Sequence, residues 1–112
     1  MKGEQYLTSQ AQFQAVYTGG TSWADRHVVL KVLPNALDIS RYGLSVSRRV
    51  GKAVIRNRVK RRLREIIRST ALKPGWDIVI IARTPAAGVD YQGLAGSVRN
   101  GLDTTGITAG RQ

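Results

Sequence analysis

Residues 48–68 read RRVGKAVIRNRVKRRLREIIR, and this stretch decides both the fold and the surface of the chain. Its apolar side chains recur at the spacing of one helix face, which predicts a long helix from about Ala53 to Ser69. The buried stripe of that helix would consist of Ile55, Val59, Leu63 and Ile66. The same stretch holds ten of the eighteen Lys and Arg residues and a single acid, Glu65. The opposite face is therefore either a solvated surface or a surface for a polyanion.

The charge of the whole chain favours the second interpretation. Its 112 residues have a formal net charge of +11, and an anionic partner would relieve the self-repulsion of so much like charge. Arginine outnumbers lysine thirteen to five, and guanidinium groups pair with phosphate through two hydrogen bonds and stack on bases. Ordinary solvated helices mix acids with bases at helical spacing, but here most arginines have no acid to pair with. We expect nucleic acid as the partner, ahead of an anionic membrane or an acidic protein.

The remaining composition indicates one small cytoplasmic domain without membrane contact. The chain has no cysteine, which excludes disulfides and cysteine-bound zinc and fits a reducing compartment. No apolar run approaches the ~20 residues of a membrane span, and the first residues lack the apolar segment of a signal peptide. We expect a single domain over residues 1–112, with a core from 7 to 104 and a flexible tail from 105 to 112.

The order of predicted elements indicates an α+β fold with helices packed on a mixed sheet. We expect a first helix capped by Thr8 or Ser9, extended structure, the long helix, a further strand and a last helix capped by Asp90. The strands are expected within residues 21–33, 42–47 and 76–82. Both faces of residues 28–33 and 76–82 are largely apolar, which is typical of inner strands.

Two features near the predicted sheet favour single-stranded RNA over DNA. Gly43, Ser45 and Ser47 alternate with apolar residues, so one sheet face would be small and polar, with room for a ligand backbone to approach closely. Phe13 and Tyr17 share one face of the first helix, where they are either core residues or rings on which bases stack. No helix-turn-helix or zinc finger is recognisable.

The inventory of reactive groups argues against catalysis by the protein itself. The acids are scattered singly, and none is spaced from another for general acid and base chemistry; they are Glu4, Asp25, Asp38, Glu65, Asp77, Asp90 and Asp103. His27 is the single histidine, so a surface or strand-edge position is more plausible for it than a metal site. If the protein takes part in a reaction, another molecule must supply the reactive groups.

Residues 51–61, GKAVIRNRVKR, resemble the signature of the bacterial ribonuclease P protein component, with its Arg-Asn-Arg core followed by Lys-Arg. Residues 42–51, YGLSVSRRVG, resemble the strand that leads into that helix in the family. Residues 13–19 resemble the family's first helix, and residues 77–83 its last strand. The resemblance spans about residues 7–104, with all four segments in the family's order.

The resemblance implies the protein subunit of a ribonucleoprotein endonuclease that removes 5′ leaders from precursor tRNA. The catalyst would be the RNA subunit, working with Mg²⁺ bound mainly by RNA, and the protein alone would be monomeric. The implied fold is a ribosomal-protein-like α/β sandwich with a left-handed strand-helix-strand crossover. Such crossovers are otherwise right-handed in ~98% of cases. A non-enzymatic ribosomal or RNA-chaperone protein remains the alternative, and a membrane-surface binder is a third possibility.

The resemblance also assigns residues to two RNA surfaces. Those implied to face the catalytic RNA are Arg48, Arg49, Lys52, Arg56, Asn57, Arg58, Lys60, Arg61 and Arg64. Those implied to line a cleft for the precursor tRNA leader are Phe13, Tyr17, Trp23, Lys31 and Ser45. The chain departs from the family in its nearly neutral N-terminus, with Lys2 and Glu4, and in Lys31, which stands where an aromatic residue often lines the cleft.

Overall fold

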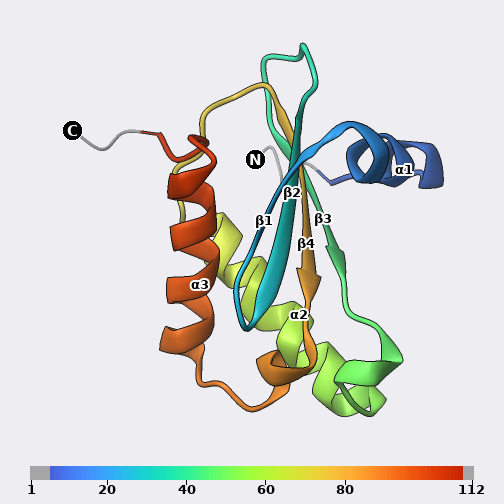
Figure 1. The fold of residues 1–112 in the computed structure, drawn as a ribbon, viewed down its shortest axis with the longest axis vertical. Helices are drawn as coiled ribbons and strands as arrows, with labels where there is room; N and C mark the ends of the chain where they lie inside the picture. The colour runs from blue at the N-terminus through green and yellow to red at the C-terminus, as the bar shows by residue number, and fades with distance from the viewer. Residues whose placement is uncertain (1–5, 110–112) are drawn as a thin grey trace.

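The computed structural model describes residues 6–109, which form a four-stranded mixed sheet with helices on both faces (Figure 1). The predicted α+β order is confirmed, with two short 3-10 helices, η1 and η2, added. The elements are α1 (Gln10–Gly19), β1 (Thr21–Ala24), β2 (Val28–Pro34), β3 (Arg41–Ser45), η1 (Arg48–Val50), α2 (Ala53–Arg68), β4 (Trp76–Ala82), η2 (Thr84–Ala87) and α3 (Tyr91–Thr104).

The strands lie in the order β1-β2-β4-β3. β2 pairs antiparallel with both β1 and β4, whereas β3 pairs parallel with β4. The two strands with apolar residues on both faces, β2 and β4, therefore occupy the inner positions, as predicted. Since α2 connects β3 to the parallel β4, these three elements form the strand-helix-strand unit for which the resemblance implies a left-handed crossover.

The main core lies between the sheet and the pair α2 and α3. The predicted stripe of α2 contributes Val59, Leu63 and Ile66, all fully buried, with Ile55 packed at its edge. They meet the alternate side chains of β2 and β4 that point to this face, such as Leu30. Burying one such side chain contributes roughly 1.5–3 kcal/mol, so this face determines how α2 is rotated about its axis.

The helix α1 covers only one end of the opposite sheet face (Figure 1). Its start is defined by a capping box, because the Ser9 hydroxyl accepts from the Gln12 amide while the Gln12 side chain accepts from the Ser9 amide. Val16 of α1 packs with Leu7 and Val79 in a second, smaller apolar cluster. Within residues 6–109, no other helix covers this sheet face (Figure 1).

The prediction of a flexible tail beginning at residue 105 is wrong for residues 105–109. Ile107 is fully buried in the main core, its carbonyl accepts from the Lys73 amide, and the Ala109 amide donates to the Ala71 carbonyl. The composition of this segment is polar and rich in Gly and Thr, which led to the prediction of a flexible tail. A single isoleucine in the sequence gave no indication that it would be buried. Residues 110–112 of the predicted tail lie outside the described residues.

A buried ion pair joins the start of β4 to its neighbours. Asp77 is 5% exposed and accepts from the Arg41 guanidinium at 2.7 and 2.9 Å and from the Asn35 amide at 2.8 Å. Burial alone would raise the pKa of Asp77, but these hydrogen bonds and the Arg41 charge lower it below its usual value. The acid that looked isolated in the sequence is therefore a structural tie between β3, β4 and the turn after β2.

Candidate nucleic-acid interface

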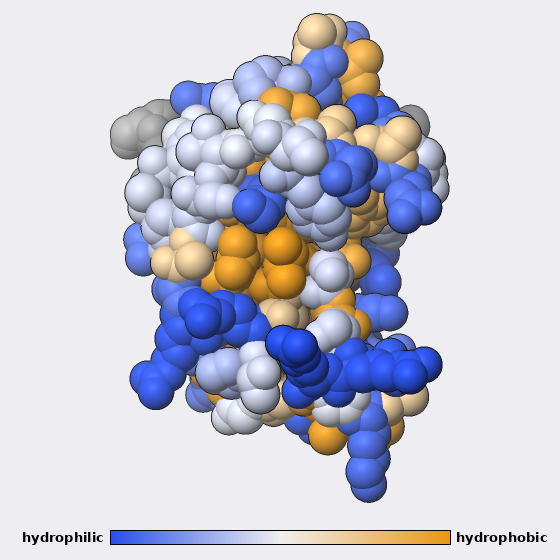
Figure 2. Space-filling view, turned by 45° about the vertical axis from the view of Figure 1, so that its right-hand side comes forward, coloured by the Kyte–Doolittle hydropathy of each residue, from blue (hydrophilic) through white to orange (hydrophobic). Residues whose placement is uncertain are grey.

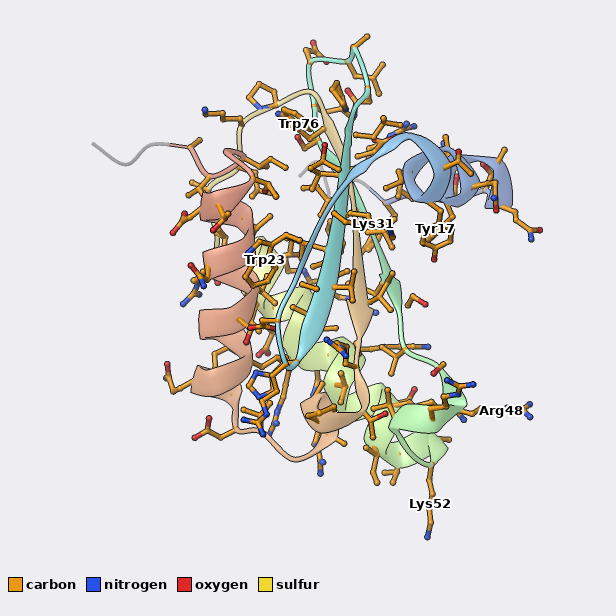
Figure 3. The ribbon with its side chains drawn as sticks, viewed as in Figure 1. Tyr17, Trp23, Lys31, Arg48, Lys52 and Trp76 are labelled. Carbon is orange, nitrogen blue, oxygen red and sulfur yellow. The ribbon has the colours of Figure 1, made fainter. Side chains whose placement is uncertain are left out.

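The residues implied to face the catalytic RNA lie together on η1 and α2, and we call this set the basic surface. Five of its nine members are exposed, namely Arg48, Arg49, Lys52, Asn57 and Arg61. Figure 3 shows Arg48 and Lys52 pointing away from the body of the protein at the end where α2 begins. Because the apolar stripe holds α2 against the sheet, the opposite side of the helix is presented to solvent.

Acids within residues 6–109 form no ion pair with the basic surface. Glu65 forms no ion pair with Arg61 or Arg62, and no member of the basic surface pairs with an acid anywhere in residues 6–109. Six arginines and two lysines on η1, α2 and the turn between them thus create a positive field that an anionic backbone would neutralise.

Arg58, Arg62 and Arg56 of α2 also have partners inside the protein. The Arg58 guanidinium donates to the Ala87 carbonyl at 3.1 Å, and that of Arg62 to the Val89 carbonyl at 3.0 Å. Arg56 donates from its Nε to the Gly51 carbonyl at 3.0 Å. These bonds fasten α2 to η2 and to the turn before the helix, so Arg56 and Arg58 have structural roles that the sequence did not reveal.

The sheet face beside α1, which we call the open face, brings together four of the five residues implied to line the leader cleft. Phe13 and Tyr17 project from α1 with ring centroids 6.3 Å apart. Lys31 pairs with Val79 and Ser45 pairs with Ile81, so both lie on the same sheet face as these two residues of β4. Lys31 donates to the Ser22 hydroxyl at 2.7 Å, which holds its charge on this face.

Figure 2 shows an apolar patch, coloured orange, in the middle of the open face, with paler residues of intermediate hydropathy above it. Ile81 and Val29 are paired across β2 and β4 and are only partly buried. Strongly hydrophilic side chains lie below the apolar patch in that view (Figure 2). The face therefore offers rings and an apolar floor next to the positive charge of Lys31, a combination that suits a single strand of nucleic acid.

Gly43 does not leave open room for a ligand backbone, contrary to the prediction. It is buried beneath the Phe13 ring, and a Cβ atom at this position would collide with that ring. The lack of a side chain instead lets the Phe13 ring approach the strand closely, half-buried beside the second apolar cluster. Phe13 is thus both a core residue and a wall of the open face.

Trp23 does not line the open face, so its assignment to the leader cleft is wrong. The register pairs Trp23 with Leu30, whose side chain is in the main core. A Cβ on Gly101 of α3 would lie 2.5 Å from the Trp23 ring, and Figure 3 shows Trp23 directed toward α3. Trp23 packs where a glycine in α3 makes room for it, and Ser22 takes the neighbouring position on the open face.

His27 lies in the turn between β1 and β2, one residue before β2 begins, and is half-buried. Its Nδ1 lies 2.8 Å from the Ser97 hydroxyl of α3, and the Asp25 carboxylate accepts from the backbone amides of His27 and Val28. In the described part of the chain, no three His, Cys, Asp or Glu side chains gather where they could hold a metal ion. These residues tie the β1–β2 turn to α3.

Sequence reasoning missed one basic residue beside the basic surface. Arg83, which follows β4, lines with Arg49, Ser47 and Thr84 a polar hollow of about 300 Å³. Its guanidinium also donates to the Asp25 carbonyl at 2.8 Å. Arg83 is far from residues 48–68 in the chain, and only the parallel pairing of β3 with β4 brings the ends of the two strands together.

Comparison with known proteins decides the family. The family model described as Ribonuclease P matches residues 1–106. The chain belongs to the ribonuclease P protein family. A ribonuclease P protein component from Dehalococcoides mccartyi is 48% identical over 89 residues, which cover 80% of this chain and 74% of that one. One from Clostridioides difficile is 39% identical over 105 residues, covering 91% and 92%.

The fold agrees with this assignment. The structure of the ribonuclease P protein of Staphylococcus aureus superposes with a TM-score of 0.84 at 32% identity, covering 96% of this chain and all of that one. The chain is thus the protein subunit of ribonuclease P, and the alternative of a ribosomal or RNA-chaperone protein is not favoured. None of the helices within residues 6–109 is long and apolar enough to cross a membrane.

Proposed function

We propose that the protein binds the catalytic RNA of ribonuclease P through the basic surface and holds the 5′ leader of precursor tRNA on the open face. The observation that carries this proposal is that the protein has two surfaces of different chemical character. One is densely cationic and unpaired with acids in the described residues, and the other combines rings with an apolar floor.

The basic surface suits a folded RNA. Its cations are spread over η1 and along α2 as far as Arg64, so they match phosphates spaced along a backbone and are too widely placed for one small anion. Asn57 is exposed among them and adds no charge. Its amide can both donate and accept, which gives the surface a contact that depends on geometry more than on charge.

The open face suits a single strand. Tyr17 is 36% exposed, so one face of its ring is available for stacking, which contributes about 1–3 kcal/mol per base. Lys31 supplies one positive charge beside the apolar floor. A duplex would keep its bases stacked inside the helix, so a single-stranded leader fits these features better than the paired stem of tRNA.

The protein's role in the reaction is to position and to bind, while the RNA carries out hydrolysis. A site for Mg²⁺ built from the protein's own acids does not fit the described residues, where no suitable cluster exists. We propose that the metal is held mainly by RNA and that the complex works in the cytoplasm. No reaction step is assigned to a side chain of this protein.

Reconstitution tests the proposal. Purified protein is added to the catalytic RNA of the same bacterium with precursor tRNA at low Mg²⁺, and cleavage is followed over time. We expect cleavage to be faster with the protein, and the gain to shrink for a precursor whose leader is cut to a single nucleotide. Cleavage that is unchanged by the protein would refute the proposal.

A further inference from the structure

A second hollow lies at the outer edge of β3, away from the middle of the open face. It has a volume of about 220 Å³, and its walls come from the segment before α1, from α1, from β3 and from α2. The residues that matter here are Tyr6, Phe13, Tyr42, Lys60 and Arg64. Tyr6 and Tyr42 were assigned no role from the sequence.

The hollow exists because the outer edge of β3 is paired at only one point in residues 6–109. Tyr6 forms a single parallel bridge with Tyr42, and the Leu7 amide donates to the Tyr42 carbonyl at 2.9 Å. Leu7 itself is 6% exposed and packs in the second apolar cluster. Tyr6 is therefore held in position by its neighbour, and the β3 edge beyond it faces the hollow.

One wall of the hollow is aromatic. The Tyr6 and Tyr42 rings have centroids 5.1 Å apart and planes tilted by 53°. Tyr42 is buried at 6% exposure, whereas Tyr6 is 42% exposed. The inner ring is thus fixed by the core and supports the outer ring, whose exposed part borders the hollow. Such an arrangement offers a flat organic ring a preformed surface on which to stack.

The facing wall is cationic. Lys60 and Arg64 are four residues apart on α2, so they lie on one side of the helix, and both are half-buried with their stems against the protein. Burial raises the pKa of the Tyr42 hydroxyl, while the charge of Arg64 acts in the opposite direction, as expected for a cation close to that ring. Among residues 6–109, no acid lines the hollow.

Rings on one side and cations on the other match the two parts of a nucleotide. A volume of about 220 Å³ is below the roughly 300–1,000 Å³ of pockets for drug-sized ligands, so the hollow suits a single nucleotide. A base reaches an aromatic side chain only when it is unstacked from its neighbours, which is common in RNA loops and bulges. The cations belong to α2, the helix that carries the basic surface.

We propose that this hollow binds one unpaired nucleotide of the catalytic RNA, with its base stacked on Tyr6 and its phosphate held by Lys60 and Arg64. The inference rests on the proposed function, because it takes the RNA to lie along α2. It adds a contact in which an aromatic ring near the start of the chain recognises a base, in a region that the sequence left nearly neutral.

The test compares Tyr6→Leu with Tyr6→Phe in binding to the catalytic RNA alone, without tRNA. Leucine keeps apolar bulk but removes the ring face, whereas phenylalanine keeps the ring. We expect Tyr6→Leu to weaken binding about tenfold and Tyr6→Phe to restore it to within about twofold. The slope of log affinity against log salt should stay unchanged in both, because a neutral ring releases no counterions. Leu37→Ala, at another exposed apolar side chain, is the control for truncation.

Photocrosslinking gives a second readout that does not depend on affinity. With p-benzoylphenylalanine in place of Tyr6, we expect crosslinks to one nucleotide of the catalytic RNA, and fewer of them when Lys60→Ala is added. Wild-type affinity for Tyr6→Leu, or crosslinks scattered over many nucleotides, would overturn the inference. A loss confined to leader-bearing precursor tRNA would assign the hollow to the leader and also overturn it. Absence of any binding by the wild-type protein would instead refute the proposed function.

Discussion

At the scale of single residues, two glycines decide what two aromatic rings do. Gly43 lets Phe13 lie on the open face, and Gly101 lets Trp23 pack against α3. In both places the missing side chain is replaced by a ring from another element. The sequence displays four such residues without showing that they form two pairs.

Gly43→Ala tests the first pair. The new methyl group would push the Phe13 ring away from the sheet, and because that ring is half-exposed it can move outward. We expect the free energy of unfolding to fall by only about 1–2 kcal/mol. Affinity for leader-bearing precursor tRNA should fall several-fold more than affinity for mature tRNA, as measured by titration of the reconstituted complex.

Gly96→Ala is the matched control, because a Cβ at this helical glycine meets nothing within 4 Å. It should leave both affinities unchanged and add slightly to stability. Equal losses of precursor and mature tRNA binding in Gly43→Ala would show that Phe13 acts only as a core residue.

At the scale of elements, α2 combines two functions on opposite sides. Val59, Leu63 and Ile66 fix it to the sheet, and its other side carries most of the basic surface. Arg58 and Arg62 lie between these sides and bond to backbone carbonyls near η2 and α3. Removing an exposed cation should therefore affect binding without unfolding the helix, whereas removing Arg58 would affect both.

Arg61→Ala measures the electrostatic part of this interface. Arg61 is exposed and has no acidic partner in the described part of the chain. We expect weaker binding to the catalytic RNA and a slope of log affinity against log salt that is shallower by about 0.9 for one lost phosphate contact. The melting temperature should not change.

Lys73→Ala is the control for this substitution. It removes the same charge from an exposed position in the turn between α2 and β4. This turn follows the C-terminal end of α2, whereas η1 and its exposed arginines precede the N-terminal end. The salt slope of Lys73→Ala should equal that of the wild type. A slope for Arg61→Ala that also equals the wild type would mean that Arg61 contacts no phosphate.

At the scale of the whole molecule, the high net charge makes internal ties between distant segments important. Asp77, Arg41 and Asn35 join β4, β3 and the turn after β2. Because the pKa of Asp77 is lower in the folded protein than its ordinary value near 3.9, its ionised form favours folding. This stabilisation is fully present above about pH 4 and disappears as the pH falls through the lower folded pKa.

Asp77→Asn removes this charge while keeping the shape of the side chain. We expect it to lower the free energy of unfolding at pH 7 by about 1–3 kcal/mol, because Arg41 is left without its carboxylate. The free energy of unfolding is measured in urea at several pH values. The difference in this free energy between wild type and variant should become smaller below pH 4. A difference that does not depend on pH would show that the ionisation of Asp77 contributes nothing.

Much of the fold follows from short-range patterns. The stripe of α2, the apolar runs of β2 and β4 and a first helix capped by Thr8 or Ser9 were all predicted, because each depends on residues within a few positions of one another. The structure selects Ser9 as the cap. The clustering of the basic surface was predicted in the same way, since nearly all of its members share one helix and the turn before it. The family resemblance added the assignment of the two RNA surfaces.

By itself, the sequence determined the order of elements, the amphipathic basic helix and the family. Only the tertiary structure decided which face Trp23 occupies, since a strand's register is set by its partner and a shift of one residue moves every side chain to the other face. It also decided the burial of Ile107, the pairing of Gly43 with Phe13 and the hollow between Tyr6 and α2. Each of these joins residues far apart in the chain, where local periodicity carries no information about contact.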